Sequence, residues 1–579
     1  MYYKPFDTSC VPKNWGISDD LGQIEYVFSD KTGTLTQNVM EFQKCSIHGV
    51  VYGEGITEAQ RGAATREGRA DAVEPEELAR KLAVLKDAMV STLTKLFKNR
   101  YAQINKLTLV SPKLAEDITD RTSEQAGHIT AFFRALAICH TVLADKPEPA
   151  EKPCYLEYKA ESPDEAALVA AARDVGFPFV GKSKDAIDIE VMGQPERYTL
   201  LKTIEFNSTR KRMSVIVRTP DGRIVLYCKG ADSVVYERLS ASVDPALKEK
   251  TTKDMDMFAN GGLRTLCIAY KVLTEDQFLM WVRTYDAATA ATENREEEVE
   301  KAASSIEQEL LLLGATALED KLQVGVPEAI ETLHRAGIKL WILTGEPDIE
   351  CRCVPRCLVN SLPGDKLQTA IEIGFSCNLL KQDMEIMILS ADTPEGTRAQ
   401  IEAGLNKIAS ILGPPSLDPR KRGFVPGAQA AFAVVIDGET LRHALTPDIK
   451  PLFLNLGTQC ETVVCCRVSP AQKALTVKLV RPCFLPENAY THGLIQVKEG
   501  RKAMTLSIGD GANDVAMIQE ANVGCGLLGH EGSQAAMSAD YAFGQFRFLT
   551  KLLLVHGRWS YQRIADMHSN FFYKVPCLL

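Results

Sequence analysis

Short apolar runs alternate with helical and turn-rich stretches along the chain, and this pattern predicts an α/β protein. Apolar runs bounded by charged or turn-forming residues are typical of buried strands. They cover residues 23–28, 37–52, 198–206, 213–218, 224–229, 310–318, 338–343, 431–436, 463–466 and 504–508, and residues 261–266 lead into a further strand. Helices are expected after Pro163, Pro327 and Pro470, because proline fits the first turn of a helix.

The predicted strands fall into two groups. Within residues 131–310, a Pro-Asp-Gly turn at 220–222 joins two strands as a hairpin, which indicates a separate α+β unit. The strands outside this unit end in polar residues and alternate with helices, as in a parallel sheet. Residues 53–130 are charged and rich in alanine, with helical spacing over 78–96, and predict a helical surface insertion.

Composition narrows the function classes. The 579 residues are enough for several domains, and a net charge of −9 without a long basic stripe argues against nucleic acid as the main partner. The sixteen cysteines are scattered and no secretory signal is recognisable, so a reduced, cytosolic setting is expected. Cys351, Cys353 and Cys357 lie close together, but no matching pair follows at zinc spacing, so a chance cluster is preferred.

The first predicted strand ends in a turn that holds the strongest chemical candidate. Asp30 follows the strand, and Lys31, Thr32 and Gly33 follow Asp30. A carboxylate at the end of a strand lies where open α/β sheets bind ligands, and it can attack phosphorus and carry the phosphoryl group covalently. The alternative interpretation is an Asp–Lys pair in an exposed turn.

Later strand ends supply the other parts that phosphoryl transfer requires. Thr344 and Gly345 end a strand, where a hydroxyl and an exposed amide can bind phosphoryl oxygens. Lys473 lies near the start of a helix and can neutralise developing phosphoryl charge. Asp510 and Asp514 follow the last strong strand, and two carboxylates four residues apart suit a hard cation such as Mg²⁺. A calcium-like turn or a plain turn is the alternative.

Residues 30–36 (DKTGTLT) resemble the phosphorylation motif of P-type ATPases, which belong to the haloacid dehalogenase superfamily. Further strings resemble the type IV branch of that family, the phospholipid flippases, and its fungal members in particular. They are residues 162–167 (SPDEAA), 205–208 (EFNS), 229–232 (KGAD) and 262–266 (GLRTL) in the α+β unit, and 519–524, 531–536 and 546–549 later in the chain. The resemblance covers most of residues 13–574.

The resemblance implies a fold and a set of site residues. The fold is a doubly wound, haloacid-dehalogenase-like phosphorylation domain with an inserted α+β nucleotide-binding domain. The implied catalytic residues are Asp30 as nucleophile, Lys31, Thr344, Gly345 and Lys473. The implied ATP-binding residues are Asp30, Lys31, Thr32, Glu165, Phe206, Lys211, Lys229, Arg264, Thr344, Gly345, Asp365, Arg467, Lys473, Asn513 and Asp514. Among them, the resemblance implies that Phe206 stacks on the adenine. The implied Mg²⁺ ligands are Asp30, the Thr32 carbonyl, Asp510 and Asp514.

Thr32 separates two reaction types within the superfamily. Soluble phosphatases of this kind carry an Asp-x-Asp motif, and their second aspartate protonates the leaving group and later activates water. Threonine at this position removes that acid and base, so the expected outcome is a phosphoenzyme that is not hydrolysed at once. Threonine at position 32 therefore disfavours a phosphatase and favours a transporter. A transporter needs a lasting phosphoenzyme so that this state can be coupled to movement.

The motif order divides the chain into segments. Residues 1–45 and 311–555 are expected to form the phosphorylation domain, and residues 46–310 the nucleotide-binding domain, with 53–130 as its helical insertion. Residues 556–579 are expected to approach the fifth membrane helix of the family. The actuator domain and the first four membrane helices of the family would precede residue 1.

The resemblance predicts ATP-dependent phospholipid translocation through an aspartyl-phosphate. This chain would be the ATP-binding and phosphorylation core, on the cytosolic side of a multi-pass membrane protein, with ATP as substrate and Mg²⁺ as cofactor. No run of about eighteen apolar residues occurs in it, so phospholipid, membrane and accessory-subunit contacts would come from other parts. A catalytically impaired ATP-binding fragment and a soluble phosphatase of the superfamily are the alternatives.

Two stretches interrupt the match to the family. The family follows Thr-Gly directly with Asp-Lys, whereas here Asp365 and Lys366 come only after residues 346–364. Residues 481–496 form a second apparent insertion, and a third break follows Lys574. We hypothesise that these are translated introns. The first should impair catalysis, because it separates the phosphate-binding strand end from its helix, whereas the second should be tolerated as a loop.

Residues 437–440 (DGET) match the dephosphorylation motif of the flippase actuator domain. They follow a predicted strand, residues 431–436, inside the phosphorylation domain. A strand exit followed by a helix start is therefore the preferred interpretation.

Overall fold

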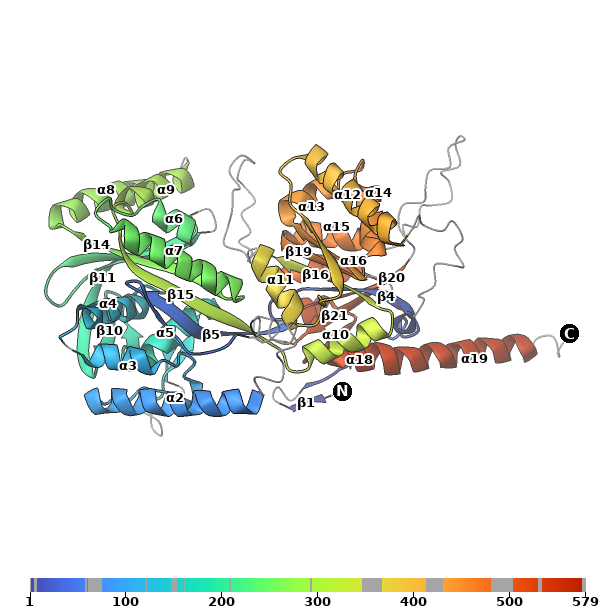
Figure 1. Ribbon diagram of the computed structural model, residues 1–579, viewed down its shortest axis with the longest axis horizontal. Helices are drawn as coiled ribbons and strands as arrows, with labels where there is room; N and C mark the ends of the chain where they lie inside the picture. The colour runs from blue at the N-terminus through green and yellow to red at the C-terminus, as the bar shows by residue number, and fades with distance from the viewer. Residues whose placement is uncertain are drawn as a thin grey trace.

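The computed structural model of the chain contains two large sheets, one mainly parallel and one antiparallel (Figure 1). It describes residues 2–4, 8–57, 60, 75–120, 122–146, 154–160, 162–207, 210–291, 294–345, 367–412, 431–480, 503–528 and 534–574. The predicted insertions at 346–364 and 481–496 and the cysteine cluster at 351–357 lie outside these residues. Two short strand pairs accompany the sheets, β1 (Tyr2–Tyr3) with β2 (Thr8–Ser9) and β7 (Leu143–Asp145) with β8 (Glu157–Lys159). The predicted mixed α/β class is confirmed.

The parallel sheet carries the predicted functional strand ends in the middle of its width. Its strands lie in the order β17 (Met384–Leu389), β18 (Ala431–Asp437), β19 (Thr462–Val468), β16 (Lys339–Gly345), β4 (Ile24–Ser29), β20 (Met504–Gly509), β21 (Val523–Leu527), β22 (Tyr541–Phe543) and β3 (Val11–Pro12). Within this sheet, the edge strand β3 alone runs antiparallel to its neighbour. Because parallel strands end at the same edge, the ends of β16, β4 and β20 lie side by side.

Helices cover both faces of the parallel sheet, which explains why its strands are almost continuously apolar. They are α10 (Val326–Arg335), α11 (Leu367–Ser376), α12 (Pro394–Leu412), α13 (Gly438–Ala444), α14 (Lys450–Gln459), α15 (Pro470–Val480), α16 (Val515–Glu520) and α17 (Gln534–Ser538). In β4, Val27 belongs to one buried cluster, whereas Tyr26 and Phe28 pack with Trp341 in another. Successive side chains of a strand point to opposite faces, so two cores enclose the strand that leads to Asp30.

The antiparallel sheet contains the predicted hairpin and extends well beyond it. Its strand order is β6 (Val50–Tyr52), β5 (Thr36–Ile47), β15 (Leu311–Leu322), β14 (Arg264–Leu273), β13 (Ile224–Gly230), β12 (Arg212–Arg218), β11 (Gln194–Asn207), β10 (Ala186–Val191) and β9 (Phe179–Lys182). The hairpin pairs β12 with β13, with Arg218 opposite Ile224, and Gly222 in its turn has a φ of 88°. A positive φ favours glycine, so the predicted turn is confirmed.

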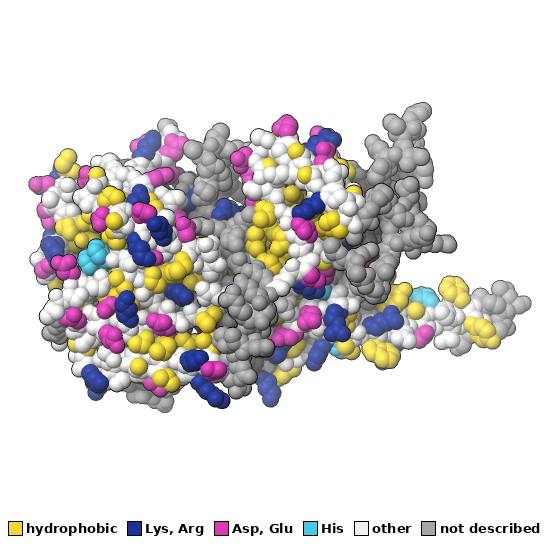
Figure 2. Space-filling model, in the orientation of Figure 1, with side chains coloured by type: hydrophobic (Ala, Val, Ile, Leu, Met, Phe, Trp, Pro, Cys, Tyr) yellow, Lys and Arg dark blue, Asp and Glu magenta, His cyan; other side chains and the backbone are white. Residues whose placement is uncertain are grey.

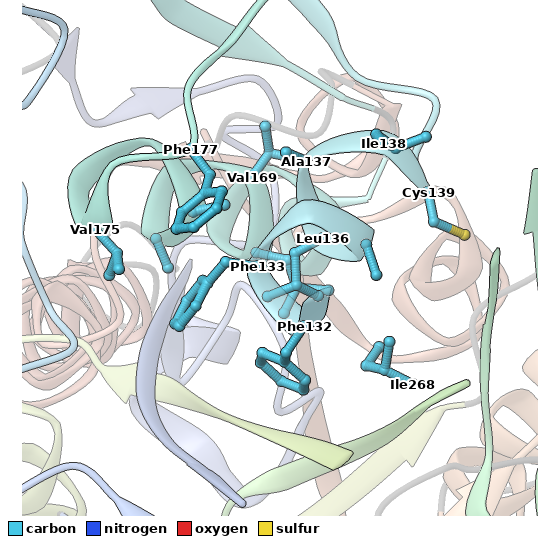
Figure 3. Packing of buried hydrophobic residues seen from close by; sticks show 14 of the residues in the cluster. Phe132, Phe133, Leu136, Ala137, Ile138, Cys139, Val169, Val175, Phe177 and Ile268 are labelled. Carbon is cyan, nitrogen blue, oxygen red and sulfur yellow. The ribbon is translucent and has the colours of Figure 1, made fainter. Parts of the chain in front are cut away.

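Helices also flank the antiparallel sheet. They are α2 (Pro75–Leu96), α3 (Pro112–Thr119), α4 (Glu124–Ile138), α5 (Pro163–Val175), α6 (Asp232–Tyr236), α7 (Pro245–Asn260), α8 (Glu275–Ala290) and α9 (Arg295–Ile306). Figure 3 shows Phe133 of α4 close to Phe177, and their ring centres are 5.8 Å apart. The ring centre of Phe132 lies 5.5 Å from that of Phe133. Met89 of α2 and Leu114 of α3 belong to the same buried cluster, so these two helices contribute to the core of this unit.

Two strands of the antiparallel sheet connect it to the parallel sheet. β5 begins at Thr36, shortly after β4 ends, and β15 ends at Leu322, shortly before α10 begins. The two strands pair from Gly314 beside Ile47 to Leu322 beside Thr36. Because both strands belong to the antiparallel sheet, we propose domain boundaries near residues 36 and 322 instead of 45 and 310.

The strand exit predicted at residues 437–440 is confirmed. β18 ends at Asp437, and α13 begins at Gly438. The Asp437 carboxylate accepts a hydrogen bond from the Thr440 amide, 2.8 Å away, and so caps the helix. This cap gives the acidic residue a structural role that needs no actuator function.

The described chain ends in three consecutive helical segments, α18 (Phe548–Lys551), η6 (Leu552–Gly557) and α19 (Arg558–Lys574). α19 extends away from the rest of the molecule (Figure 1). Figure 2 shows apolar side chains along it, and Trp559, Phe571 and Phe572 are exposed. Among the residues that the structure describes, no helix is both long and apolar enough to cross a membrane.

Candidate active site

Asp30 and Asp510 follow the neighbouring parallel strands β4 and β20 and therefore lie at the same edge of the sheet. The Asp30 amide donates a hydrogen bond to the carbonyl of Ile508, 3.1 Å away. Asp514 joins them from the single-turn helix η5 (Ala512–Asp514), and all three side chains are buried. The structure thus brings together the predicted nucleophile and the two carboxylates predicted to bind metal.

Lys473 places a buried ammonium between two of these carboxylates. Its Nζ lies 2.9 Å from Asp30 Oδ1 and 2.8 Å from Asp514 Oδ1. Lys473 lies in the first turn of α15, which Ser469 and Gln472 cap by reciprocal hydrogen bonds of 3.3 and 2.9 Å. Burial alone lowers the pKa of the Lys473 ammonium, but Asp30 and Asp514 outweigh burial and hold this pKa above its usual value.

Asp30 lies in surroundings that disfavour its charge. Burial and the neighbouring charge of Asp514 raise the pKa of Asp30 to about 6, against the opposing effect of Lys473. The ionised form is the nucleophile. At neutral pH most of the Asp30 carboxylate is therefore ionised, and it is less stabilised by its surroundings than an exposed aspartate.

The loop after Asp30 folds onto Asp510. The Thr34 hydroxyl donates a hydrogen bond to Asp510 Oδ1, 2.8 Å away. Gly33 makes this approach possible, because its φ is 74° and a Cβ atom there would lie 1.9 Å from Asp510 Oδ2. Thr34 is not among the predicted site residues, although it lies inside the motif at residues 30–36.

The three buried carboxylates form a donor set that fits a divalent cation. Asp30, Asp510 and Asp514 each offer an oxygen, and these oxygens all lie within 4.8 Å of one another. Mg²⁺ binds few carboxylates and completes its shell with water and phosphate oxygens, so this set fits Mg²⁺. The amides of Asp510 and Gly511 donate to Asp514 Oδ2 at 3.2 and 3.3 Å and hold that carboxylate in place. The role of Thr32 as a ligand stays a prediction.

Addition of Mg²⁺ is expected to release protons from the protein in a pH-dependent way. Metal ligands bind in their deprotonated form, and Asp30, with a pKa of about 6, is half protonated at pH 6. We expect about half a proton to be released per Mg²⁺ at pH 6 and almost none at pH 8. A pH indicator in weakly buffered solution measures this stoichiometry, and Asp30→Asn should abolish the release. Equal release at both pH values would contradict the assignment.

The end of β16 lies beside Lys473. A Cβ atom on Gly345 would lie 3.1 Å from Lys473 Nζ, so glycine leaves room for the ammonium. The Thr344 hydroxyl donates to the carbonyl of Cys465 on β19, 3.3 Å away. The structure therefore brings Gly345 into the site, whereas the Thr344 hydroxyl is engaged with the neighbouring strand.

Two predicted nucleotide-binding residues of the antiparallel unit form an ion pair. Lys229 Nζ on β13 lies 2.6 Å from Glu165 Oε1 on α5, and the hydroxyl and amide of Thr141 donate to Glu165 Oε2 at 2.7 and 3.0 Å. Burial raises the pKa of Glu165, but Lys229 and Thr141 outweigh burial and hold this pKa below its usual value. Glu165 and Lys229 are thus brought together, with the lysine charge balanced by a protein carboxylate.

Arg264 connects the antiparallel unit to the loop that follows Asp30. Its Nη2 atom lies 3.4 Å from the Thr32 hydroxyl. Its guanidinium also lies 3.6 Å from a carboxylate oxygen of Asp164 and 3.6 Å from one of Asp320. A cation is therefore placed where the two sheets meet, beside the predicted phosphorylation site.

The remaining predicted residues take up separate positions. Phe206 lies on β11 and is 47% exposed, so its ring offers a surface on which a base can stack. Lys211 precedes β12 and is buried, and Arg467 lies on β19. Lys31 is buried, and Asn513 lies in η5. Asp365 lies outside the described residues.

Two protein families match parts of this chain. The family described as P-type ATPase, cytoplasmic domain N matches residues 128–325, and the family described as phospholipid-translocating P-type ATPase C-terminal matches residues 536–579. The first match covers most of the antiparallel sheet and its helices, and the second begins within α17 and covers β22 and the helices that follow it. The fold, the site and these matches together define the class of the protein as a P-type ATPase.

Similarity to whole proteins narrows this class. The chain is 47% identical to the phospholipid-transporting ATPase DNF1 of Chaetomium thermophilum, 47% identical to dnf2 of Schizosaccharomyces pombe and 41% identical to the phospholipid-transporting ATPase 10 of Arabidopsis thaliana, each over 99% of its own length. The chain spans 35%, 38% and 44% of the lengths of these relatives. Over nearly its whole length the chain is thus similar to phospholipid-transporting P-type ATPases, and it spans less than half of the length of each of these relatives.

Proposed function

We propose that this chain transfers the γ-phosphoryl group of ATP to Asp30, as the phosphorylation core of a phospholipid-translocating P-type ATPase. The observation that carries the proposal is the position of Lys473, whose ammonium lies 2.9 Å from Asp30 and 2.8 Å from Asp514. A nucleophile, a fixed cation and a carboxylate set for a metal are the parts that phosphoryl transfer needs. The parallel sheet with these groups at its strand ends supports a doubly wound fold of the haloacid dehalogenase type.

Asp30 supplies the attacking oxygen. A bond forms between this oxygen and the γ-phosphorus, the bond from that phosphorus to the β–γ bridging oxygen breaks, and ADP leaves with the electron pair. Lys473 stays protonated and balances part of the negative charge that gathers around Asp30. Asp30, Asp510 and Asp514 would hold Mg²⁺, which when bound supplies further positive charge for the phosphoryl oxygens.

The antiparallel unit would bind the rest of the nucleotide. The exposed ring of Phe206 would stack on the adenine, and Lys211, Lys229 and Glu165 would line the same site. Arg264, beside Thr32, would contact the phosphates next to the reacting centre. Asp365, Arg467 and Asn513 complete the proposed set of ATP-binding residues.

The phosphorylated state would power transport in the whole protein. Thr32 lacks the acid–base function that rapid hydrolysis requires, so the aspartyl-phosphate should persist long enough to be coupled to movement. The relatives named above are phospholipid-transporting ATPases, and we propose phospholipid as the substrate that the whole protein moves across a membrane. An accessory subunit remains a predicted partner of the whole protein.

Incubation of the purified chain with γ-labelled ATP and Mg²⁺ tests the proposal. The expected result is label that is stable in acid, is removed by hydroxylamine because it is an acyl phosphate, and maps to residue 30 by peptide analysis. ATP binding without label would overturn the proposal in favour of a catalytically impaired ATP-binding fragment. Rapid turnover of small phosphate esters would overturn it in favour of a soluble phosphatase.

A further inference from the structure

The two chain segments that connect the sheets lie against each other (Figure 1). One is the loop of residues 30–35 between β4 and β5, and the other begins at Gln323, between β15 and α10. The Gln323 amide donates to the carbonyl of Leu35, 2.8 Å away, and Gln37 Nε2 donates to the carbonyl of Leu322, 2.9 Å away. The loop of residues 30–35 and the start of β5 are thus both hydrogen-bonded to the chain at residues 322–323.

The side chain of Gln323 adds three hydrogen bonds at this junction. Its Nε2 donates to the carbonyls of Gly33 and Thr36, both 3.1 Å away, and its Oε1 accepts from the Phe546 amide, also 3.1 Å away. Both N–H donors and the oxygen of the amide group are therefore used. The opposite orientation of the amide would place its oxygen against two carbonyl oxygens, so the surroundings select this one.

The carbonyls that Gln323 holds belong to the loop that shapes the site. Between them lies Thr34, whose hydroxyl donates to Asp510, and the Gly33 amide donates to the Thr36 hydroxyl at 3.0 Å. A shift of either carbonyl would move Thr34 and Asp510 relative to Asp30. Because Nε2 bonds both ends of the segment from Gly33 to Thr36, one side chain fixes its position.

The acceptor side of Gln323 reaches the segment that leads to the last helices. Phe546 is fully buried, and a Cβ atom on Gly325 would lie 3.1 Å from the Arg547 side chain, so the two segments are in close contact. α18 begins two residues after Phe546 and continues through η6 into α19. The Gln323 side chain therefore bonds the segment from Gly33 to Thr36 through its nitrogen, and through its oxygen it bonds the segment that leads into α18.

The geometry points to Gln323 as a positioning residue for the phosphorylation of Asp30. It does not touch the reacting atoms, and it acts by holding the loop from Gly33 to Thr36, and through it Asp510, in the reactive arrangement. This inference rests on the proposed function, because it concerns the rate of that phosphoryl transfer. It adds a residue outside the recognised motifs to the groups on which that rate depends.

Gln323→Glu tests this role most directly. It keeps the shape of the side chain and an acceptor for the Phe546 amide, but it replaces the two donors with an oxygen that faces two carbonyls. At saturating ATP we expect phosphoenzyme formation to slow by about tenfold, while the Kd for ATP changes by less than about twofold. Hydrogen exchange at the amides of residues 33–36 should become faster. Gln323→Met, which removes the donors without adding charge, should show the same changes to a smaller degree and serves if the glutamate variant does not fold.

Gln308→Glu is the matched control. It makes the same chemical change on an exposed side chain before β15, at the opposite end of that strand from Leu322, and should leave the rate, the Kd and the exchange unchanged. Wild-type phosphorylation rates in both Gln323 variants would overturn the inference. So would a loss of rate that is matched by weaker ATP binding and lower melting temperature, since that pattern marks a general structural role. If the wild-type chain takes up no label, the proposed function fails. Unchanged hydrogen exchange at residues 33–36 in Gln323→Glu would separately exclude positioning by Gln323.

Discussion

Asp30→Asn is expected to abolish phosphorylation while it makes the folded protein more stable. The asparagine amide has nearly the shape of the carboxylate but lacks a charged nucleophilic oxygen, so acid-stable label from ATP should fall by at least about a thousandfold. The substitution removes one of the two negative charges beside Lys473, keeps an amide oxygen that can accept its hydrogen bond, and leaves the 2.8 Å contact with Asp514 in place. ATP affinity should therefore be retained, and the loss should appear in the rate of label uptake at saturating ATP.

The gain in stability follows from the raised pKa of Asp30. The folded state holds this pKa at about 6, against an ordinary value of 3.8, so the folded state binds the proton more tightly than the unfolded state. The wild-type protein should lose stability as pH rises from about 4 to about 6, and the ionised carboxylate should cost about 1–3 kcal/mol above that range. Denaturant unfolding should therefore give Asp30→Asn a higher free energy of unfolding at pH 7.5 and a similar one at pH 4.

Asp448→Asn provides the matched control, because it makes the same change on an exposed aspartate of the parallel-sheet unit. It should keep full label uptake and change the free energy of unfolding by less than about 0.5 kcal/mol. Label on Asp30→Asn would show that another residue is the nucleophile. A less stable Asp30→Asn protein at pH 7.5 would show that the carboxylate is stabilised in the folded state, contrary to the burial argument.

The strands of the parallel sheet could be predicted because burial on both faces leaves a continuous apolar signal. β4, β16, β18, β19 and β20 begin and end within two residues of the apolar runs that predict them. The same signal shows that a strand is buried, but it does not show which strand lies beside it. For this reason the motif order assigns β5 and β15 to the phosphorylation domain, whereas their pairing places both in the antiparallel sheet.

The central charged residues of the site could be found because they lie in short motifs at strand ends. Thr34 and Gln323 have their partners far away in sequence: Thr34 bonds Asp510, 476 residues away, and Gln323 bonds Gly33, 290 residues away. No local sequence pattern shows which distant oxygen will accept a hydrogen bond from a hydroxyl or a side-chain amide. The signal for Thr34 was its place inside the motif at residues 30–36, and for Gln323 it was only a predicted strand that ends at residue 318.

The pairing of charged side chains with one another is a further feature that residue spacing in the sequence does not predict. The resemblance places Lys229, Glu165 and Arg264 around ATP, and the structure shows how each charge is balanced within the protein. Lys229 is paired with Glu165, and Arg264 lies beside Asp164 and Asp320. If ATP binds here as proposed, its phosphates would compete with protein carboxylates for both cations, and its affinity would be lower than the positive charges alone suggest.

Gly33→Ala is expected to slow phosphorylation by more than about a hundredfold without preventing folding. The φ of 74° at this position costs an alanine about 1 kcal/mol. The larger effect is steric, because the new Cβ would lie 1.9 Å from Asp510 Oδ2, so the carboxylate or the loop must move by more than 1 Å. A misplacement of about 1 Å in a catalytic group can cost about a hundredfold in rate. Label uptake at saturating ATP, measured over a range of Mg²⁺ concentrations, should show a lower rate and a higher Mg²⁺ requirement.

Gly337→Ala separates the steric effect from the backbone cost. Gly337 has a φ of 80°, almost that of Gly33, but a Cβ atom on it would meet no atom of the described residues within 4 Å. Gly337→Ala should lose about 1 kcal/mol of stability and Gly33→Ala at least as much, and only Gly33→Ala should lose phosphorylation and Mg²⁺ affinity. If Gly33→Ala kept the wild-type rate and Mg²⁺ dependence, Asp510 would not belong to the catalytic arrangement. If both variants lost activity equally, the loss would reflect backbone strain, and the close approach of Gly33 to Asp510 would have no special role in the chemistry.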